Sequence, residues 1–276
     1  MARPFLRAVL LTLLLALFAP AVGSAAVEPE DPEELYEQGL RQMKRGYYDE
    51  ALLSFQKVRT QFPFNKYSVL SELREADCLF EKAAYLEAVD SYRQFTRLHP
   101  RHPEIDYAIY RTGRAQLKLA PTVPQRDQAH TRLGLRHLQD FETRFPESDY
   151  LDEVARLRGR ANRRLARAAT QIANFYWQRK EWNAAERRYR SSATEFPDAP
   201  TAGRAQVRLG LSLAYLGRLD EARQVLAVAA EREDRWGKRA QAALEGDDLQ
   251  DRAERGERRR AVKERQRQAR ERRRAK

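Results

Sequence analysis

One short pattern of residues recurs along the chain and limits its fold more than any other feature. A full copy has a small residue, then an alanine, then an aromatic residue or leucine four positions later, and a proline eight positions further on; the third copy has Gly134 in place of the alanine, and the fifth has Asp234 in place of the proline. The first copy consists of Gly39, Ala51, Phe55 and Pro63. The positions equivalent to Ala51 in later copies are Ala88, Gly134, Ala185 and Ala222, at spacings of 37, 46, 51 and 37 residues. Self-similarity at such a period is typical of stacked structural repeats.

The residue types of this pattern fit pairs of antiparallel helices. Small side chains at Gly39 and Ala51 would let two helices approach closely, and Phe55 would fill the space beside that contact. Pro63 would end the second helix, because proline cannot continue the hydrogen-bond ladder. One pair cannot bury its apolar face alone, so roughly three or more must stack. We predict an all-α fold, a tetratricopeptide-repeat (TPR) α-solenoid of about five helix-pair repeats, with a generic helical bundle as the alternative.

The positions of glycine and proline give the approximate limits of the helices. Gly46 and Gly217 would provide turns between paired helices, and Pro121 and Pro124 predict a long loop over 120–127. Residues 151–179 contain no proline and favour one long helix. The predicted helix pairs cover 32–62, 69–99, 105–145, 150–195 and 202–232.

The net charge of +12 is concentrated near the C-terminus of the chain. Residues 249–276 hold thirteen Lys and Arg against five Asp and Glu. Between the N-terminal segment and residue 249 the charge is nearly balanced, which argues against a nucleic-acid-binding face on the folded domain. We expect the segment 236–276 to be a basic, Arg-rich tail, and its part after Asp248 to add nothing to a core. It would form an exposed helix or remain disordered, and would be either a solvated charge run or a docking segment for an anionic surface or acidic partner.

The first residues have the composition of a secretory signal. Arg3 and Arg7 precede an uncharged apolar stretch over 8–22, and small residues at 23–26 offer a cleavage site. We therefore predict a signal peptide over 1–26 and a repeat domain over 27–235. Cys78 is the only cysteine, so no intramolecular disulfide can form, and we expect it to be a small buried side chain.

Two segments go beyond a generic repeat. Residues 62–68 read FPFNKYS, and residues 99–113 read HPRHPEIDYAIYRTG. Both resemble the motifs of the BamD (YfiO/ComL-like) family of outer-membrane protein assembly lipoproteins. Phe196, Pro197, Asp198 and Thr201 match that family's penultimate linker. The resemblance covers roughly 33–235, including the stretched third repeat.

The resemblance implies a periplasmic scaffold for outer-membrane β-barrel assembly. In that family the N-terminal repeats are implicated in receiving unfolded barrel proteins, and the C-terminal repeats in docking the insertase BamA. The candidate substrate-side residues, carried over by position, are Phe62, Phe64, Tyr67, Asp106, Tyr107 and Tyr110. The candidate insertase-side residues are Arg187 and Arg188.

Each of these residues also has a purely structural interpretation. The aromatic residues of 62–67 can anchor the first repeat on the second, and Asp106 can cap a helix. Tyr107 and Tyr110 lie one turn apart and can be core residues. Arg187 and Arg188 can be solvated surface charges.

The sequence departs from the family near the predicted signal, where it has no lipobox cysteine. We therefore expect no lipid anchor, and a periplasmic protein associated with the outer membrane. Two other functions remain open: an adaptor of the Tol-Pal or cell-division type, and a DNA-uptake (competence) protein that binds through the arginine tail.

The sequence predicts no catalytic or metal chemistry. His99, His102, His130 and His137 lack the cysteines or carboxylates that would complete a zinc-type set. Phosphate-binding glycine loops and nucleophile motifs are absent from the sequence. We predict a binding protein without a cofactor, and not an enzyme.

Overall fold

The computed structural model describes residues 31–245 and 248–274, and every regular element in these ranges is an α-helix. The predicted signal peptide, 1–26, lies outside the described residues. The helices of the N-terminal half are α2 (Pro32–Lys44), α3 (Tyr48–Gln61), α4 (Lys66–Glu81), α5 (Tyr85–Leu98), α6 (Ile105–Leu119), α7 (Ala129–His137) and α8 (Phe141–Arg144). Those of the C-terminal half are α9 (Leu151–Gln178), α10 (Trp182–Glu195), α11 (Ala202–Tyr215), α12 (Leu219–Ala230), α13 (Arg235–Leu244) and α14 (Asp248–Arg274).

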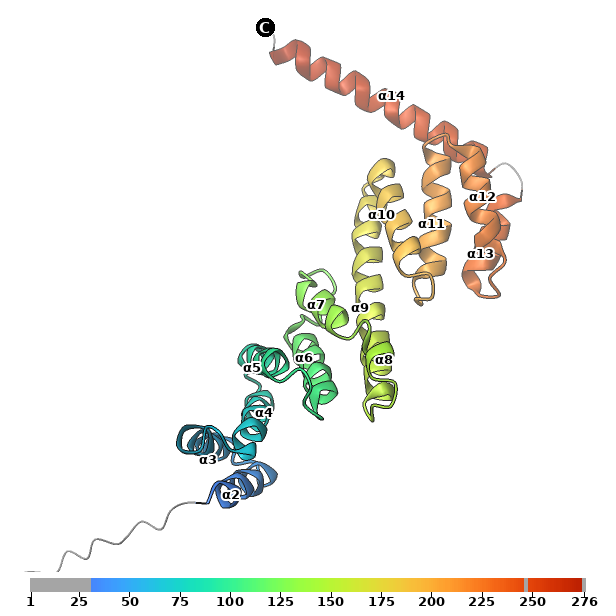
Figure 1. Ribbon diagram of the computed structural model, residues 1–276. Helices are drawn as coiled ribbons and strands as arrows, with labels where there is room; N and C mark the ends of the chain where they lie inside the picture. The colour runs from blue at the N-terminus through green and yellow to red at the C-terminus, as the bar shows by residue number, and fades with distance from the viewer. Residues whose placement is uncertain (1–30, 246–247, 275–276) are drawn as a thin grey trace, which may run out of the picture.

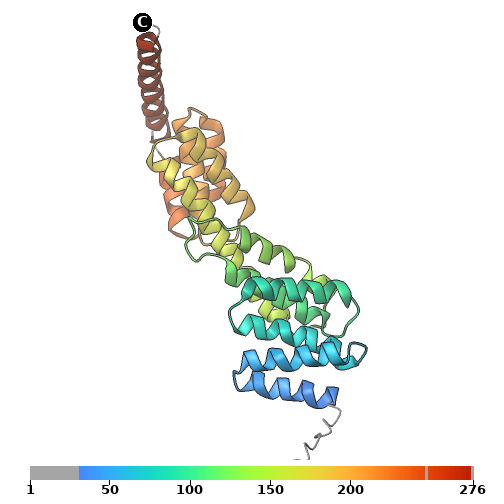
Figure 2. The same ribbon diagram turned by 90° about the vertical axis from the view of Figure 1, so that its left-hand side faces the viewer.

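Consecutive helices pack against each other as antiparallel pairs, and the pairs stack into an elongated, curved body. Figures 1 and 2 show the pairs following one another from α2 at one end to α12 and α13 at the other. The prediction of a TPR α-solenoid is confirmed. The third repeat is irregular, because its second arm is divided into α7 and the single turn α8.

The close contact within a pair is made by the large residue of the second helix as well as by the alanine position that we predicted. A side chain at Gly39 would meet the ring of Phe55 at 2.6 Å, whereas Ala51 is not among its nearest neighbours. Gly210 has the same relation to Leu226, at 2.5 Å. Both pairs are sixteen residues apart. The small residue therefore makes room for the large residue of the second helix, and at Gly210 the backbone oxygen of the repeat alanine, Ala222, would also lie 3.3 Å from an added Cβ.

The turns between paired helices need a left-handed residue. Gly46 and Gly217 fill this position with φ of 83° and 81°, as predicted from the sequence. In the second and fourth repeats the same conformation falls on Ala83 and Lys180, with φ of 60° and 58°. A Cβ atom is unfavourable there, because it lies too close to the following carbonyl oxygen.

Glycine at either of these two positions should stabilise the protein. We expect Ala83→Gly and Lys180→Gly each to raise the free energy of unfolding by about 1 kcal/mol, because the strain is relieved. Urea denaturation measures the change. Gly46→Ala is the reverse control and should lower the free energy of unfolding by a similar amount. A higher free energy of unfolding for Gly46→Ala would contradict this expectation.

Helix α9 is shared by the two halves of the solenoid. It is 28 residues long, as the absence of helix breakers predicted. Near its start, Val154 and Leu157 belong to a core cluster with Leu138 and Phe141 of the third repeat. Near its end, Ala173 belongs to the cluster of α10 and α11. One continuous helix thus joins the two bodies.

The C-terminal segment differs from the prediction. Residues 235–244 form α13, and Ala240 and Ala243 are buried in the C-terminal core. Leu249 in α14 belongs to the same core and is 5% exposed. The expectation that the tail after Asp248 adds nothing to a core was wrong, because Leu249 packs with Ala240 and Ala243 in the core of the last repeat. Beyond residue 260, however, α14 is exposed up to its last described residue.

Candidate functional site

The FPFNKYS loop between α3 and α4 divides its aromatic residues between the surface and the core. Phe64 is fully exposed. Phe62 and Tyr67 are half-buried and pack on the core cluster of the first repeat. The ring of Tyr67 lies 5.4 Å from that of Tyr36. Of the three predicted residues, Phe64 alone is free to contact another molecule.

The HPRHP loop between α5 and α6 lies beside this first loop. The two segments border a shallow depression of about 460 Å³, lined by Lys66, Val69, Leu98, His99, Pro100, Arg101 and His102. His99 is oriented by Glu72, with Nε2 3.0 Å from the carboxylate. The fold therefore brings both family-type motifs to one edge of the solenoid.

Asp106 lies in the first turn of α6 and holds a neighbouring loop. Its carboxylate accepts hydrogen bonds from the Ser148 hydroxyl, at 2.6 Å, and from the backbone N–H of Tyr107, at 2.8 Å. The residue at the N-cap position is Glu104, so the interpretation of Asp106 as the cap was wrong. Asp106 thus joins the start of α6 to the loop that follows α8.

Tyr107 and Tyr110 pack between repeats. The Tyr110 ring stacks on that of Tyr150, with centroids 4.9 Å apart and an interplanar angle of 9°. The Tyr107 ring lies 5.4 Å from Tyr150, and its hydroxyl donates to Asp77 Oδ1 at 2.7 Å. Tyr107 therefore has a mainly structural position, whereas Tyr110 also borders the cleft described below.

Asp77 is the centre of a buried polar network that the sequence analysis missed. It is 3% exposed and accepts hydrogen bonds from the hydroxyls of Tyr92, at 2.5 Å, and Tyr107. Arg74 donates to its other oxygen at 2.8 Å, and Arg111 lies 3.4 Å away. Burial, and then the Asp77 charge, raise the pKa of Tyr92 and Tyr107, so both remain proton donors. The network joins α4, α5 and α6.

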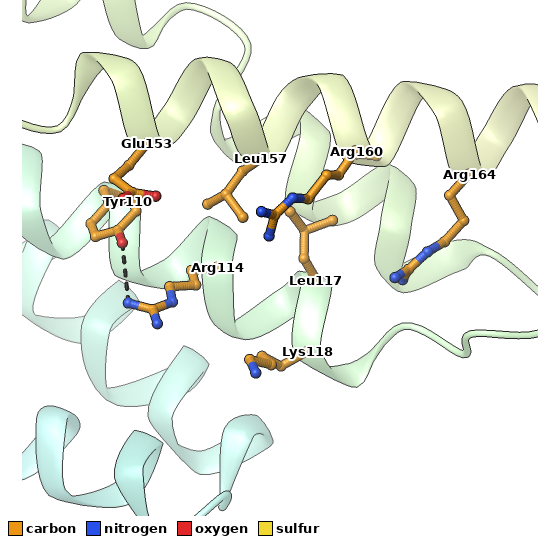
Figure 3. A pocket seen from close by; sticks show the side chains of 9 residues that line it. Tyr110, Arg114, Leu117, Lys118, Glu153, Leu157, Arg160 and Arg164 are labelled. Carbon is orange, nitrogen blue, oxygen red and sulfur yellow. Dashed lines mark hydrogen bonds between the residues drawn. The ribbon is translucent and has the colours of Figure 1, made fainter. Parts of the chain in front are cut away.

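A cationic cleft lies between α6 and α9 (Figure 3). Its volume is about 330 Å³, and it is lined by Tyr110, Arg114, Leu117, Lys118, Glu153, Leu157, Arg160, Ala161 and Arg164. Figure 3 shows Arg114 and Arg160 on either side of Leu157, with Leu117 beside them. Leucines thus form an apolar floor between positive charges.

The charge of this cleft is poorly balanced. Glu153 is the only carboxylate of its lining, and it pairs with Arg156, which lies outside the lining, at 2.7 Å. Arg114 donates to the Tyr110 hydroxyl at 3.1 Å. Four cations therefore face one space without an acidic partner from its walls, an arrangement that favours an anionic ligand.

The four cations could have been found from their spacing. Arg114 and Lys118 are four residues apart on α6, and Arg160 and Arg164 are four apart on α9. Side chains with this spacing share one helix face. The long helix over 151–179 was predicted, but the sequence alone does not show that its face packs opposite that of α6.

Arg187 and Arg188 lie on α10, in the C-terminal half and apart from the substrate-side candidates (Figure 1). Both are exposed. With Tyr176, Ala184 and Ser191 they border a small hollow of about 230 Å³. They are accessible to a partner, as an interface residue must be.

Residues 31–245 and 248–274 contain neither a cluster of metal-ligating side chains nor a helix that could span a membrane. No three histidine, cysteine or carboxylate side chains gather there as metal ligands would. No helix in these ranges combines the length and apolarity that crossing a bilayer requires. Cys78 is fully buried, as predicted, and burial raises the pKa of its thiol to about 12.

Comparison with known proteins identifies the family. A profile of the YfiO family, described as outer membrane lipoprotein, matches residues 28–227. The outer membrane protein assembly factor BamD of Rickettsia prowazekii (strain Madrid E) is 31% identical over 194 residues, 70% of this chain and 77% of that protein. The BamD of Xylella fastidiosa (strain Temecula1) is 28% identical over 240 residues, 80% of this chain and 82% of that protein.

Solved structures give a weaker likeness. The crystal structure of MamA is 20% identical, with 75% of this chain and 94% of that chain covered and a TM-score of 0.33. The fold assignment rests on the helix pairs described above. The match over most of the sequence, with the two motif loops on one edge of the solenoid, decides the relationship: the chain belongs to the YfiO family, whose description is outer membrane lipoprotein.

Proposed function

We propose that this protein is a periplasmic TPR scaffold that takes part in outer-membrane β-barrel assembly by binding unfolded barrel proteins and a BamA-type insertase. Membership of the YfiO family and similarity to proteins named BamD support the proposal. Its mechanism is binding in a preformed site, without catalysis or a cofactor. The protein is exported by the segment 1–26 and is held at the outer membrane through its partners.

The observation that carries the proposal is the cationic cleft between α6 and α9. An unfolded polypeptide offers apolar side chains together with carboxylates, including the one at its C-terminus. The cleft matches both, since Leu117 and Leu157 form its floor and Arg114, Arg160 and Arg164 its rim. Arginine binds carboxylates through two parallel hydrogen bonds. Ligand-binding sites typically have an apolar surface with a small number of precisely placed polar groups around it.

The other candidate residues have distinct parts in this proposal. Phe64 offers an exposed ring to an aromatic or apolar side chain of the substrate. Tyr110 forms one wall of the cleft, and Asp106 and Tyr107 hold α6 in position. Phe62 and Tyr67 support the loop that carries Phe64. Arg187 and Arg188 are the insertase-side contacts on α10.

Charge reversal in the cleft should weaken substrate binding. We expect Arg160→Glu/Arg164→Glu to lower the affinity for a peptide from the last strand of a barrel protein by more than about tenfold, because each lost charged hydrogen bond costs roughly 1.5–3 kcal/mol. Fluorescence anisotropy with a labelled peptide that keeps its free C-terminal carboxylate measures this.

A matched control lies on the same helix. Arg163→Glu/Arg167→Glu makes the same change of charge at exposed positions outside the cleft lining. It should leave the affinity within about twofold, because exposed charges act weakly on a ligand held elsewhere. Equal losses in both variants would reject the cleft as the binding site.

The insertase contact has its own test. The tagged protein should retain a BamA-type barrel from detergent-solubilised envelopes, and Arg187→Glu/Arg188→Glu should reduce the recovered amount about tenfold, in line with the loss of interfacial arginines. Absence of that barrel from the wild-type eluate would count against the proposed function.

A further inference from the structure

Helix α14 carries its charges in rows. Arg260, Arg267 and Arg274 follow one another at intervals of seven residues, and so do Lys263 and Arg270. Seven residues are close to two helical turns, so the members of a row share one side of the helix. We call these five residues the near rows. A second set at the same interval, the far row, consists of Arg258, Arg265 and Arg272.

The near rows face the body of the protein. Arg260 donates to the backbone oxygen of Tyr215 at 2.8 Å, and Lys263 bonds Glu181 of the α9–α10 turn at 2.7 Å. Gly256 lies against the backbone of Tyr215 on the same side. The far row points elsewhere, since the Arg258 side chain is 80% exposed.

The near rows continue past the end of the body. Figure 1 shows α14 crossing the tips of the neighbouring helices and extending beyond them. All residues from 261 to 274 are exposed. Arg267, Arg270 and Arg274 therefore present a charged face on the side of α14 that contacts the body near Arg260, and within this face Arg267 pairs with Glu271 at 2.9 Å. The part of α14 beyond Lys263, residues 264–274, is roughly 15 Å long at about 1.5 Å per residue.

Where α14 crosses the α9–α10 turn, the two elements enclose a hollow of about 230 Å³. We call it the crossing hollow; it is lined by Lys180, Glu181, Trp182, Asn183, Leu216, Gly256, Arg259, Arg260 and Lys263. Four of these residues are cations and one is an anion. The hollow and the free near rows form one continuous positive surface.

The crossing hollow also contains unused hydrogen-bond donors. Trp182 Nε1 and Arg259 Nε are both buried, and neither has a hydrogen-bond partner among the described residues. A buried donor without an acceptor costs about 1–3 kcal/mol, so each such group calls for an explanation. Both are donors, and both line the same cationic space. An acceptor that carries negative charge would satisfy them.

We propose that the crossing hollow and the near rows of α14 bind an acidic segment of a partner polypeptide, with one carboxylate in the hollow and others along Arg267, Arg270 and Arg274. Lys180, Arg260 and Lys263 are exposed, so rotation of these long side chains opens the hollow to a carboxylate. Residues 248–274 lie beyond the segment 28–227 that matches the YfiO profile. The other wall of the hollow, with Lys180, Trp182 and Leu216, lies within that segment, and no residue of the hollow lines the cleft between α6 and α9.

The geometry favours a polypeptide over a bilayer or a nucleic acid. A flat lipid surface cannot reach donors inside a hollow beneath a crossing helix, and Val262 is the only large apolar side chain exposed on the described part of α14. Insertion of a helix into a membrane interface needs an apolar face. A nucleic-acid duplex is wide enough to meet the adjacent row of Glu257, Glu264 and Glu271, which would repel its phosphates. A peptide is narrow enough to follow the near rows, where it must displace only Glu271 from its ion pair with Arg267.

The test uses the full-length protein and a short fluorescein-labelled polyglutamate peptide. Arg267→Gln/Arg270→Gln/Arg274→Gln should weaken binding about tenfold, because three exposed charge pairs are lost. Arg258→Gln/Arg265→Gln/Arg272→Gln removes the same charge from the far row and should change the affinity less than about twofold. Trp182→Phe removes the indole N–H and keeps a ring over Tyr215, and should weaken binding about fivefold or more.

The outcomes separate the proposal from its alternatives. Equal losses in the near-row and far-row variants, or unchanged binding by Trp182→Phe, would overturn it. Vesicles of phosphatidylglycerol and phosphatidylethanolamine, and a short DNA duplex, are the competing probes. Tighter, salt-sensitive binding of either one than of the peptide would assign α14 to that partner instead.

Discussion

Replacement of Asp77 by alanine is expected to lower the free energy of unfolding by about 3–5 kcal/mol. The change removes the buried carboxylate that half-buried Arg74 and buried Arg111 share, and leaves them the more exposed carboxylates of Glu104 and Glu81. Removal of one partner from a buried charge pair has a cost of this size. The hydroxyls of Tyr92 and Tyr107 also lose their acceptor. Chemical denaturation followed by circular dichroism measures the loss.

Two companion variants show whether the buried network is responsible. Asp90→Ala removes a carboxylate from an exposed position on α5 and should change stability by less than about 0.5 kcal/mol. Asp77→Asn keeps an acceptor for the tyrosine hydroxyls, and its loss of unfolding free energy should lie between those of Asp77→Ala and Asp90→Ala. A small effect for Asp77→Ala would mean that the arginines find other partners and that the network does not hold these repeats together.

Gly256→Ala is expected to detach α14 from the last repeat. A Cβ atom at this position would lie 1.9 Å from the backbone oxygen of Tyr215, so the helix must move away. Overpacking of a close contact costs about 1–3 kcal/mol. Amide hydrogen exchange in 250–263 should accelerate about tenfold or more, and trypsin should cleave this arginine-rich segment sooner.

Gly159→Ala is the matched control for this prediction. Gly159 lies inside α9, where an added Cβ would meet only the guanidinium end of Arg163, at 3.3 Å. Alanine is favoured over glycine within a helix by about 0.5–1 kcal/mol, so this variant should be as stable as the wild type or more so. Normal exchange of α14 in Gly256→Ala would show that the helix tolerates a shift and that the contact is not decisive.

The sequence was most informative where structure is determined locally. The intervals between Gly39, Ala51, Phe55 and Pro63 gave the helix pairs, since each residue acts within one hairpin. The long α9 followed from the absence of helix breakers. Ala83 and Lys180 show the limit of this reasoning, because their left-handed conformation is imposed by the repeat and not by their own preferences.

The candidate site was less predictable, because its residues meet across repeats. Asp77 binds residues 15 and 30 positions away, and no periodic rule pairs them. Phe62 and Phe64 are alike in sequence and differ only in which way the loop turns. In α14, Gly256 is a lone glycine within a charged helical segment, and such a glycine can indicate that another backbone packs closely there. The low apolar content of the segment argued against any packing.

The length of α9 has a consequence for how the two halves of the molecule are oriented. Because this helix is continuous, every residue added or removed in its middle rotates the C-terminal half by about 100° around the helix axis and shifts it by about 1.5 Å. One extra residue would rotate α10 by about 100° relative to the cleft between α6 and α9. Seven extra residues would nearly restore the relative orientation of the two halves while moving them roughly 10 Å further apart. Insertions in α9 that keep the orientation of the two halves are therefore limited to lengths close to a whole number of turns, such as about seven or eleven residues.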